Sequence, residues 1–271
     1  MRVDARLLEL IEAEAWADIY RAVPAALAEE HGIAVLDLGA AAACIVARGV
    51  PSLMLNRVIG LGVGVPATSA MLDLAAEAFG ETRYMIPVAP QCQPPELTGW
   101  LRARGFEAGY AWMKFERGAE PPPAAATELE VRRAGPEDAD AFGQALVAGY
   151  ELPGWMAGWV AALVGRPGWS CYVAFAGSEP AAAGCAYIRP PVAWLGLAGT
   201  VPELRRRGGQ GAIMAARITE AIEAGCTAIG TETGERVLGR ASASYSNIMR
   251  FGFTEAYVRP NLMSPPGDEV A

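Results

Sequence analysis

Histidine is almost absent from this sequence, since His31 is the only one among its 271 residues. A single imidazole excludes a metal centre built on several histidines, and none stands near the arginine-rich motif described below to form a Ser-His-Asp triad. Cysteine is also scarce. Its five residues are odd in number and widely spaced, with no Cys-x-x-Cys pair: Cys44, Cys92, Cys171, Cys185 and Cys226. This pattern opposes a disulfide framework or a zinc site and predicts buried free thiols in a reducing compartment.

Excess positive charge and long apolar runs are lacking too. The net charge is −8, which argues against nucleic acid as a partner, because binding to a phosphate backbone needs a basic face. Gly, Pro or charged residues break every apolar run well short of a membrane span, and the first six residues carry too much charge for a signal peptide. With 52% apolar and 19% charged residues, we expect a well-packed, soluble protein of the cytoplasm that binds no membrane.

The clearest boundary in the chain is residues 118–127, where three consecutive prolines can continue neither a helix nor a central strand. It separates residues 1–117 from residues 128–271, each long enough for a domain. The second segment predicts mixed α/β structure: an antiparallel opening and then a β-α-β unit. We expect strands over 129–132, 170–175, 181–188, 194–200, 226–231 and 253–262, with helices over 135–148, 153–164, 212–224 and 244–250.

The most informative stretch is GTVPELRRRGGQGA, residues 199–212, which joins a predicted strand to a predicted helix. Its glycines let backbone N–H groups approach an anion, and the start of the helix adds the positive end of its dipole. Its three arginines supply donors for phosphate oxygens. The motif predicts a site for a phosphorylated cofactor, and the alternative is a solvated turn with incidental charge.

A weak internal repeat links the two segments. Residues 104–110 (RGFEAGY) resemble residues 251–257 (FGFTEAY) at an offset of 147 residues. The same offset places Gly62 and Gly64 against Gly209 and Gly211, but the arginine triplet then faces Val58, Ile59 and Gly60. If the halves are duplicates, the first has lost the charges that grip phosphate.

These residues resemble the GNAT superfamily, the acyl-CoA-dependent N-acetyltransferases. Residues 206–211 (RRGGQG) satisfy the family pattern Arg/Gln-x-x-Gly-x-Gly/Ala, and residues 247–253 (NIMRFGF) are similar to its closing Gly-Phe element. The resemblance implies two GNAT-like domains, 1–117 degenerate and 128–271 active, each a mostly antiparallel mixed sheet flanked by helices around a β-α-β core. It implies that coenzyme A is held by Ala198, Gly199, Thr200, Arg205, Arg206, Arg207, Gly208, Gly209, Gln210, Gly211, Ala212 and Asn247. Asn247 has an alternative role as a helix cap.

The family's usual tyrosine acid is missing, because Ile248 stands at its place. Tyr257 is our candidate for protonating the departing thiolate, with Tyr245 or water as substitutes. Backbone N–H groups around residues 198–200 are expected to polarise the thioester carbonyl. Glu232, at the end of a predicted strand, is our candidate base for the attacking amine. The plainer interpretations are that Tyr257 packs in a strand, as its repeat partner Tyr110 suggests, and that Glu232 is an ordinary polar residue.

The resemblance therefore predicts a cytoplasmic N-acetyltransferase that moves an acetyl group from acetyl-CoA to a primary amine, without a metal. The acceptor is a small-molecule or peptide amine that the sequence does not identify. Two alternatives are a transferase for another acyl-CoA, and a non-catalytic sensor or interaction module that binds acyl-CoA. Because an internal repeat can replace the pairing of two chains, a monomer is favoured over a homodimer.

Overall fold

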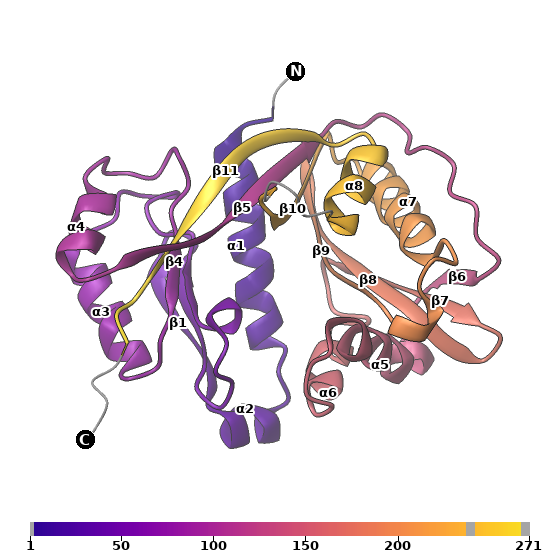
Figure 1. Ribbon diagram of the computed structural model, residues 1–271, viewed down its shortest axis with the longest axis horizontal. Coiled ribbons are helices and arrows are strands. Elements are labelled where there is room, and N and C mark those ends of the chain that lie inside the picture. The colour runs from indigo at the N-terminus through magenta and orange to yellow at the C-terminus, as the bar shows by residue number, and fades with distance from the viewer. Residues whose placement is uncertain (1–2, 237–241, 267–271) are drawn as a thin grey trace.

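The structure, a computed structural model, describes residues 3–236 and 242–266. Within these residues, eleven strands form one continuous sheet in the order β1-β2-β3-β4-β11-β5-β10-β9-β8-β7-β6. Figure 1 shows that residues 3–106 build one side of the molecule and residues 118–236 the other, while β5 and β11 cross between them. Pairing is antiparallel except between β3 and β4 and between β9 and β10. The mixed α/β architecture predicted from the sequence is confirmed.

The two halves share one order of helices and strands, except that the C-terminal half begins with an additional strand, β6. The N-terminal half contains α1 (Ala5–Arg21), α2 (Ala25–His31), β1 (Ile33–Gly39), β2 (Ala42–Ala47), β3 (Arg57–Ile59), α3 (Ser69–Phe79), β4 (Met85–Pro87), α4 (Leu97–Ala103) and β5 (Glu107–Arg117). The C-terminal half contains β6 (Glu130–Arg133), α5 (Ala139–Tyr150), α6 (Met156–Ala161), β7 (Trp169–Ala176), β8 (Glu179–Arg189), β9 (Val192–Thr200), α7 (Gly209–Glu223), β10 (Ala228–Gly234), α8 (Ala243–Arg250) and β11 (Thr254–Met263). Residues 118–129 between the halves form no helix or strand.

Local chemistry explains where several helices begin. The Asp4 carboxylate accepts from the backbone N–H of Arg6 at the start of α1. Thr68 accepts from Met71 at the start of α3, and Ser242 accepts from Tyr245 at the start of α8. These are N-cap interactions, which satisfy backbone donors that a helix cannot pair internally.

The two halves exchange their last strands. The strand β5 of the N-terminal half pairs with β10 of the C-terminal half, and β11 inserts between β4 and β5. The first residues of these strands, Glu107 and Thr254, are separated by the 147-residue offset of the sequence repeat. The repeat is therefore a repeat of structure, and each half completes its part of the sheet with a strand of the other.

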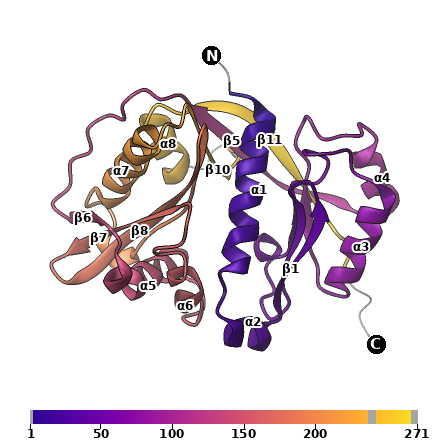
Figure 2. The ribbon, with the colours of Figure 1, turned by 180° about the vertical axis from the view of Figure 1, so that it is seen from behind.

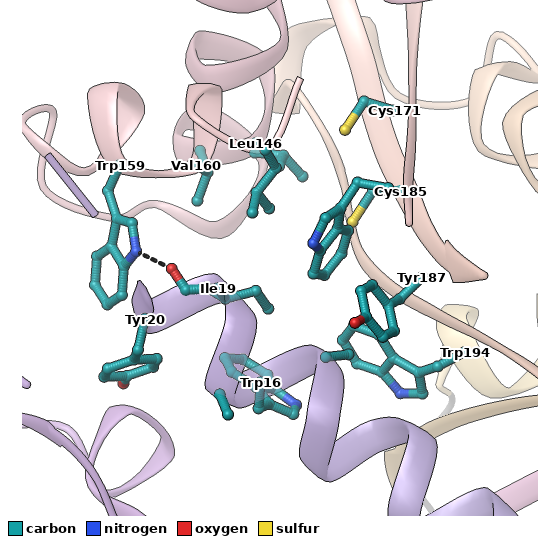
Figure 3. Close-up of a cluster of buried hydrophobic side chains, with 14 of the residues drawn as sticks. Trp16, Ile19, Tyr20, Leu146, Trp159, Val160, Cys171, Cys185, Tyr187 and Trp194 are labelled. Carbon is teal, nitrogen blue, oxygen red and sulfur yellow. Dashed lines mark hydrogen bonds between the residues drawn. The ribbon is translucent and has the colours of Figure 1, made fainter. Parts of the chain in front are cut away.

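Helices cover both faces of the sheet. On one face, α1, α5 and α6 enclose the largest buried cluster, which includes Trp16, Trp159 and Trp194 (Figures 2 and 3). The other face is covered by α3 and α4 in the N-terminal half and by α7 and α8 in the C-terminal half. Residues of β2 alternate between the two cores, with Ile45 in the first and Val46 in the second, as the period of a strand requires.

The helix α1 joins the halves. Its Asp18 carboxylate accepts two hydrogen bonds of 2.7 Å from Arg166, and its Ile19 carbonyl accepts a 2.8 Å bond from the indole of Trp159 (Figure 3). Its Glu14 accepts from the Tyr187 hydroxyl at 2.7 Å. One helix of the N-terminal half is thereby fixed to the helices and strands of the C-terminal half.

Candidate active site

The parallel strands β9 and β10 separate at the centre of the C-terminal half. Their last ladder pair is Trp194 with Gly230, followed by a 2.7 Å bond from the Thr231 hydroxyl to the Leu195 carbonyl. Beyond this point β9 continues along β8 as far as Thr200, and β10 continues along β5 as far as Gly234. The strands therefore open into a wedge, and both edges of the wedge carry polar groups of the backbone that the other strand does not pair.

A β-bulge shapes the β9 side of the wedge. Cys185 pairs with Gly196 but Ala183 pairs with Gly199, so β9 carries one extra residue there, and Leu197 adopts a φ of 44°. Such left-handed backbone is costly for a leucine and clusters at functional sites. The Ala198 N–H, which the sequence analysis assigns to thioester polarisation, donates to the Tyr150 hydroxyl at 3.1 Å.

Arg217 of α7 supports the bulge from within. The side chain is 1% exposed, and its Nη1 atom donates to the carbonyl oxygens of Cys185 at 2.9 Å and Gly196 at 3.1 Å. Burial lowers the pKa of Arg217, and no carboxylate in the described residues forms an ion pair with it. Because the buried Arg217 cation donates to two backbone carbonyl oxygens, it fixes the shape of this strand edge.

The glycine-rich loop leads from β9 to α7 and presents a row of free donors. Arg206 and Gly208 adopt φ values of 68° and 83°, and Gly208 is the N-cap of α7. Among the described residues, none accepts a hydrogen bond from the six consecutive backbone N–H groups of residues 206–211. Together with the start of a 15-residue helix, these donors make a cradle for an anion such as a pyrophosphate.

Arginines surround this cradle. Arg205, Arg206 and Arg207 are all exposed, and within the described residues only Arg205 has a carboxylate within 4.0 Å, that of Glu151. Arg250 of α8 was not predicted. Its Nη2 atom lies 3.1 Å from the position that a Cβ on Gly211 would occupy, which places the guanidinium over the first turn of α7.

The structure brings Asn247 to the same place, since its Oδ1 atom accepts a 2.7 Å bond from Arg250. Asn247 thereby orients an arginine at the cradle. The other predicted cofactor-binding residues all lie along the wedge and the loop: Ala198, Gly199 and Thr200 on β9, and Gly208, Gly209, Gln210, Gly211 and Ala212 at the start of α7. The Thr200 hydroxyl is buried and lacks a partner among the described residues.

Glu232 lies just past the last β9–β10 pair, on the face of the sheet that α1 covers. Its side chain is 6% exposed, and it accepts bonds of 3.2 and 3.0 Å from the Trp194 indole and one of 2.9 Å from Lys114. Burial and the nearby Glu12 carboxylate raise the pKa of Glu232, although Lys114 opposes the rise. A carboxylate whose pKa is raised is a stronger proton acceptor than an ordinary glutamate, and Glu232 lies at the wedge.

The structure does not bring the candidate acid Tyr257 to the wedge. Tyr257 lies on β11, which β5 separates from β10, and its hydroxyl donates to Glu9 at 2.8 Å. The Tyr245 hydroxyl donates to Glu255, and the ring is buried on the α8 side. Ile248, at the place of the usual tyrosine, is 3% exposed and belongs to the core between α7 and α8.

The corresponding part of the N-terminal half is filled by the protein itself. A Cβ on Gly62 would lie 2.7 Å from the Gln93 carbonyl oxygen, and one on Gly64 would lie 2.1 Å from that of Ala40. Where β3 and β4 end, a cavity of about 10 Å³ remains, room for about one water, lined by Glu9, Glu12, Ala13, Ile59, Gly60, Pro87 and Arg259. The glycines of this half are therefore packed against the backbone of neighbouring loops, and ionic side chains line the remaining cavity.

Residues 3–236 and 242–266 contain no group of three or more His, Cys, Asp or Glu side chains placed to hold a metal ion. Within the same residues, every helix is too short or too polar to span a bilayer. The five cysteines are buried and form no disulfide.

Comparison with known proteins gives similarity in structure alone. No family model matches the chain, and no curated protein matches its sequence. It is similar to a GCN5-related N-acetyltransferase from Kribbella flavida, with a TM-score of 0.62 and 16% identity over 97% of each chain. It is also similar to one from Sphaerobacter thermophilus, with a TM-score of 0.57 and 14% identity over 93% of this chain and 92% of the other.

A third similar structure is a tandem GNAT protein from the clavulanic acid biosynthesis pathway. Its TM-score is 0.56 at 19% identity, covering 84% of this chain and 79% of the other. These likenesses, with the repeated order of elements and the opened parallel pair, define the class: the chain has the GNAT fold twice, in tandem. The fold expected from the sequence motifs is confirmed.

Proposed function

We propose that this protein is an acyltransferase that moves an acyl group, acetyl in the simplest case, from coenzyme A to a primary amine. The observation that carries the proposal is the run of six backbone N–H groups, residues 206–211, that have no acceptor among the described residues and lead into α7 beside the wedge between β9 and β10. A pyrophosphate on this row would allow the rest of an extended cofactor to follow the wedge. The GNAT fold of the chain supports the same assignment.

The cofactor would be held by few groups. The backbone of residues 206–211 would bind the pyrophosphate, and Arg206, Arg207 and Arg250 would add charge-assisted hydrogen bonds to its phosphates. The closed loops of the N-terminal half favour one cofactor per chain. Coenzyme A would supply the acyl group as a thioester, and the net transfer replaces its C–S bond by a C–N bond.

Two side chains would carry the proton transfers that such a reaction needs. We assign the base to Glu232, which would take the proton that the amine nitrogen loses. The Tyr150 hydroxyl accepts from Ala198, so its own proton is available to the sulfur that leaves. This assignment gives Tyr150 the role that the sequence analysis gives Tyr257.

A different acyl donor and a non-catalytic sensor of acyl-CoA are the competing functions. The sensor is favoured by Ile248 at the usual acid position and by the tight ion pairing of Glu232. A donor that is longer than acetyl would need space at the wedge beside Trp194 and Leu197. Release of free coenzyme A that depends on an added amine separates both enzymes from the sensor, and a panel of acyl-CoA donors separates the enzymes from each other.

The decisive experiment is calorimetric titration of acetyl-CoA and of free coenzyme A into the whole protein, followed by turnover with a panel of amines. We expect one equivalent to bind, and Arg206→Ala and Arg250→Ala each to weaken binding by roughly tenfold, as loss of one charged hydrogen bond does. Arg102→Ala, an exposed arginine on α4, is the matched control and should bind as the wild type does. Failure of both nucleotides to bind would refute the proposal, and two equivalents would refute the closed N-terminal site.

A further inference from the structure

A buried ionic cluster connects the N-terminal half to Glu232. Lys114 of β5 donates to Glu232 at 2.9 Å and also to Glu12 of α1. Glu12 in turn accepts bonds of 2.6 and 2.9 Å from the two terminal nitrogens of Arg259 on β11. The Lys114, Glu12 and Arg259 side chains are between 1% and 3% exposed, so water screens these interactions very little.

Ion pairs join five charged groups in this cluster: the carboxylates of Glu9 and Glu12 on α1 and of Glu232 on β10, and the cations Lys114 of β5 and Arg259 of β11. The Arg57 guanidinium of β3 is buried beside them, where it stacks over the Trp16 ring, 4.1 Å from the ring centroid, and forms no ion pair within the described residues. Trp194 of β9 adds its indole donor to Glu232. Every one of the cluster's charged groups except Glu232 comes from the N-terminal half or from the exchanged strand β11.

The carboxylates share the cations unequally. Glu12 binds Arg259 through both oxygens and also binds Lys114, whereas Glu232 binds Lys114 and no other cation of the described residues. Although burial raises the pKa of Glu12, Arg259 and Lys114 outweigh it and lower that pKa far below its usual value, while the pKa of Glu232 is raised. The carboxylate with the fewest cations beside it is therefore the one at the wedge.

We propose that Lys114 and Glu12, both supplied by the N-terminal half, are positioning residues of the acyl-transfer site: Lys114 holds the Glu232 carboxylate at the wedge, and Glu12 competes for Lys114 and so sets the proton affinity of Glu232. This inference rests on the proposed function. It gives the N-terminal half a chemical role in addition to its structural one. The same Glu12 and Arg259 line the closed wedge of the N-terminal half, so one ionic group serves both halves.

The test reads the titration of Glu232 directly, by NMR of protein labelled with ¹³C at the glutamate carboxyl carbons, with Glu232→Gln to assign the resonance. Lys114→Met removes the cation beside the carboxylate, so the pKa of Glu232 should rise by about one unit or more. Glu12→Gln removes the competing anion, so the pKa of Glu232 should fall. Glu14→Gln is the matched control, because Glu14 lies on the same helix but binds Tyr187 and Arg189 instead.

The pH profile of kcat for the most active amine supplies the second readout. Its acid limb should move to higher pH in Lys114→Met and to lower pH in Glu12→Gln, while the affinity for acetyl-CoA stays the same. Unchanged titration of Glu232 in both variants would overturn the inference, and so would a titration that shifts without moving the acid limb. If Lys114→Met does not fold, Glu12→Gln decides alone.

Unfolding of both variants beside a folded Glu14→Gln would overturn the inference in favour of a purely structural cluster. Absence of turnover in the wild type, with the expected NMR shifts, would refute the proposed function and leave the coupling between Lys114, Glu12 and Glu232 standing. The two failures are therefore distinguishable.

Discussion

The Arg217 guanidinium donates to the carbonyl oxygen of Gly196, 3.1 Å away, at the residue where β9 leaves its regular pairing with β8. This contact joins the helix behind the glycine-rich loop to the bulge at the wedge. We expect Arg217→Met to lower the free energy of unfolding by roughly 2 to 4 kcal/mol, because two buried carbonyl oxygens lose their donor. Urea denaturation followed by circular dichroism measures the change.

Arg217→Lys is the matched variant, since it keeps the charge and one donor and should lose about half as much. Replacing buried ionic groups by apolar side chains is sometimes neutral or stabilising. A methionine variant as stable as the wild type would therefore show that the bulge does not depend on Arg217.

The exchange of β5 and β11 predicts that the halves cannot fold alone. Residues 1–117 without the rest lack β11 between β4 and β5, and residues 128–271 alone lack β5 between β10 and β11. Each fragment would expose unpaired strand edges and half of a buried interface. We expect no cooperative thermal transition from either fragment, and a stable complex when both are produced together.

Circular dichroism melting curves and amide dispersion in NMR spectra test this expectation. A cooperative transition and acetyl-CoA binding by residues 128–271 alone would show that the exchanged strand is dispensable. That result would also confine the function to the C-terminal segment.

Much of the fold could be predicted because its signals are local. The predicted helix over residues 244–250 lies within α8, and the predicted strand over residues 170–175 lies within β7. The repeat at 147 residues correctly matched β5 to β11. The exchange itself could not be read from the sequence, because alternating hydrophobicity fixes which face a strand buries but not which strand lies beside it.

The candidate site also has a part that the sequence predicts and a part that it does not. The glycines and arginines of residues 205–212 lie in one loop, so their spacing alone suggested an anion site. Tyr150, Lys114 and Arg250 come from three other elements and reach the site only through tertiary packing. One local signal for Tyr150 was its neighbour Gly149, where a Cβ would lie 2.6 Å from the Thr200 nitrogen and thereby block the approach of α5 to β9.

Asp18 predicts a pH dependence of stability. Although burial alone raises its pKa, the hydrogen bonds from Arg166 and the Trp169 indole outweigh that effect and lower it. A carboxyl group whose pKa is lower in the folded state stabilises the protein above its unfolded-state pKa of about 3.9, and this contribution disappears as pH falls through the folded-state value. Asp18→Asn should therefore cost on the order of 2 kcal/mol at neutral pH and progressively less in acid.

Urea midpoints measured from neutral pH down to about pH 3 give the difference in stability between Asp18→Asn and the wild type at each pH. Asp140→Asn, on the exposed side of α5, controls for the change in net charge. A stability difference that stays constant over the whole pH range would mean that the carboxylate charge of Asp18 contributes nothing to stability.

Tyr150 and Tyr257 are the two candidates for donating a proton to the leaving sulfur, and only one of them lies at the wedge. The Tyr150 hydroxyl lies against the Ala198 N–H at the wedge, whereas the Tyr257 hydroxyl donates to Glu9 beyond β5. We expect Tyr150→Phe to lower kcat by roughly tenfold to a hundredfold with little change in acetyl-CoA affinity, within or below the usual contribution of a general acid. Tyr257→Phe should leave kcat nearly unchanged and lower stability by about 1 kcal/mol, through loss of one hydrogen bond.

Steady-state kinetics with the most active amine and thermal melting of both variants measure these effects. The reverse pattern, with kcat lost only in Tyr257→Phe, would return the acid role to Tyr257 and would require β11 to reach the wedge in the working enzyme.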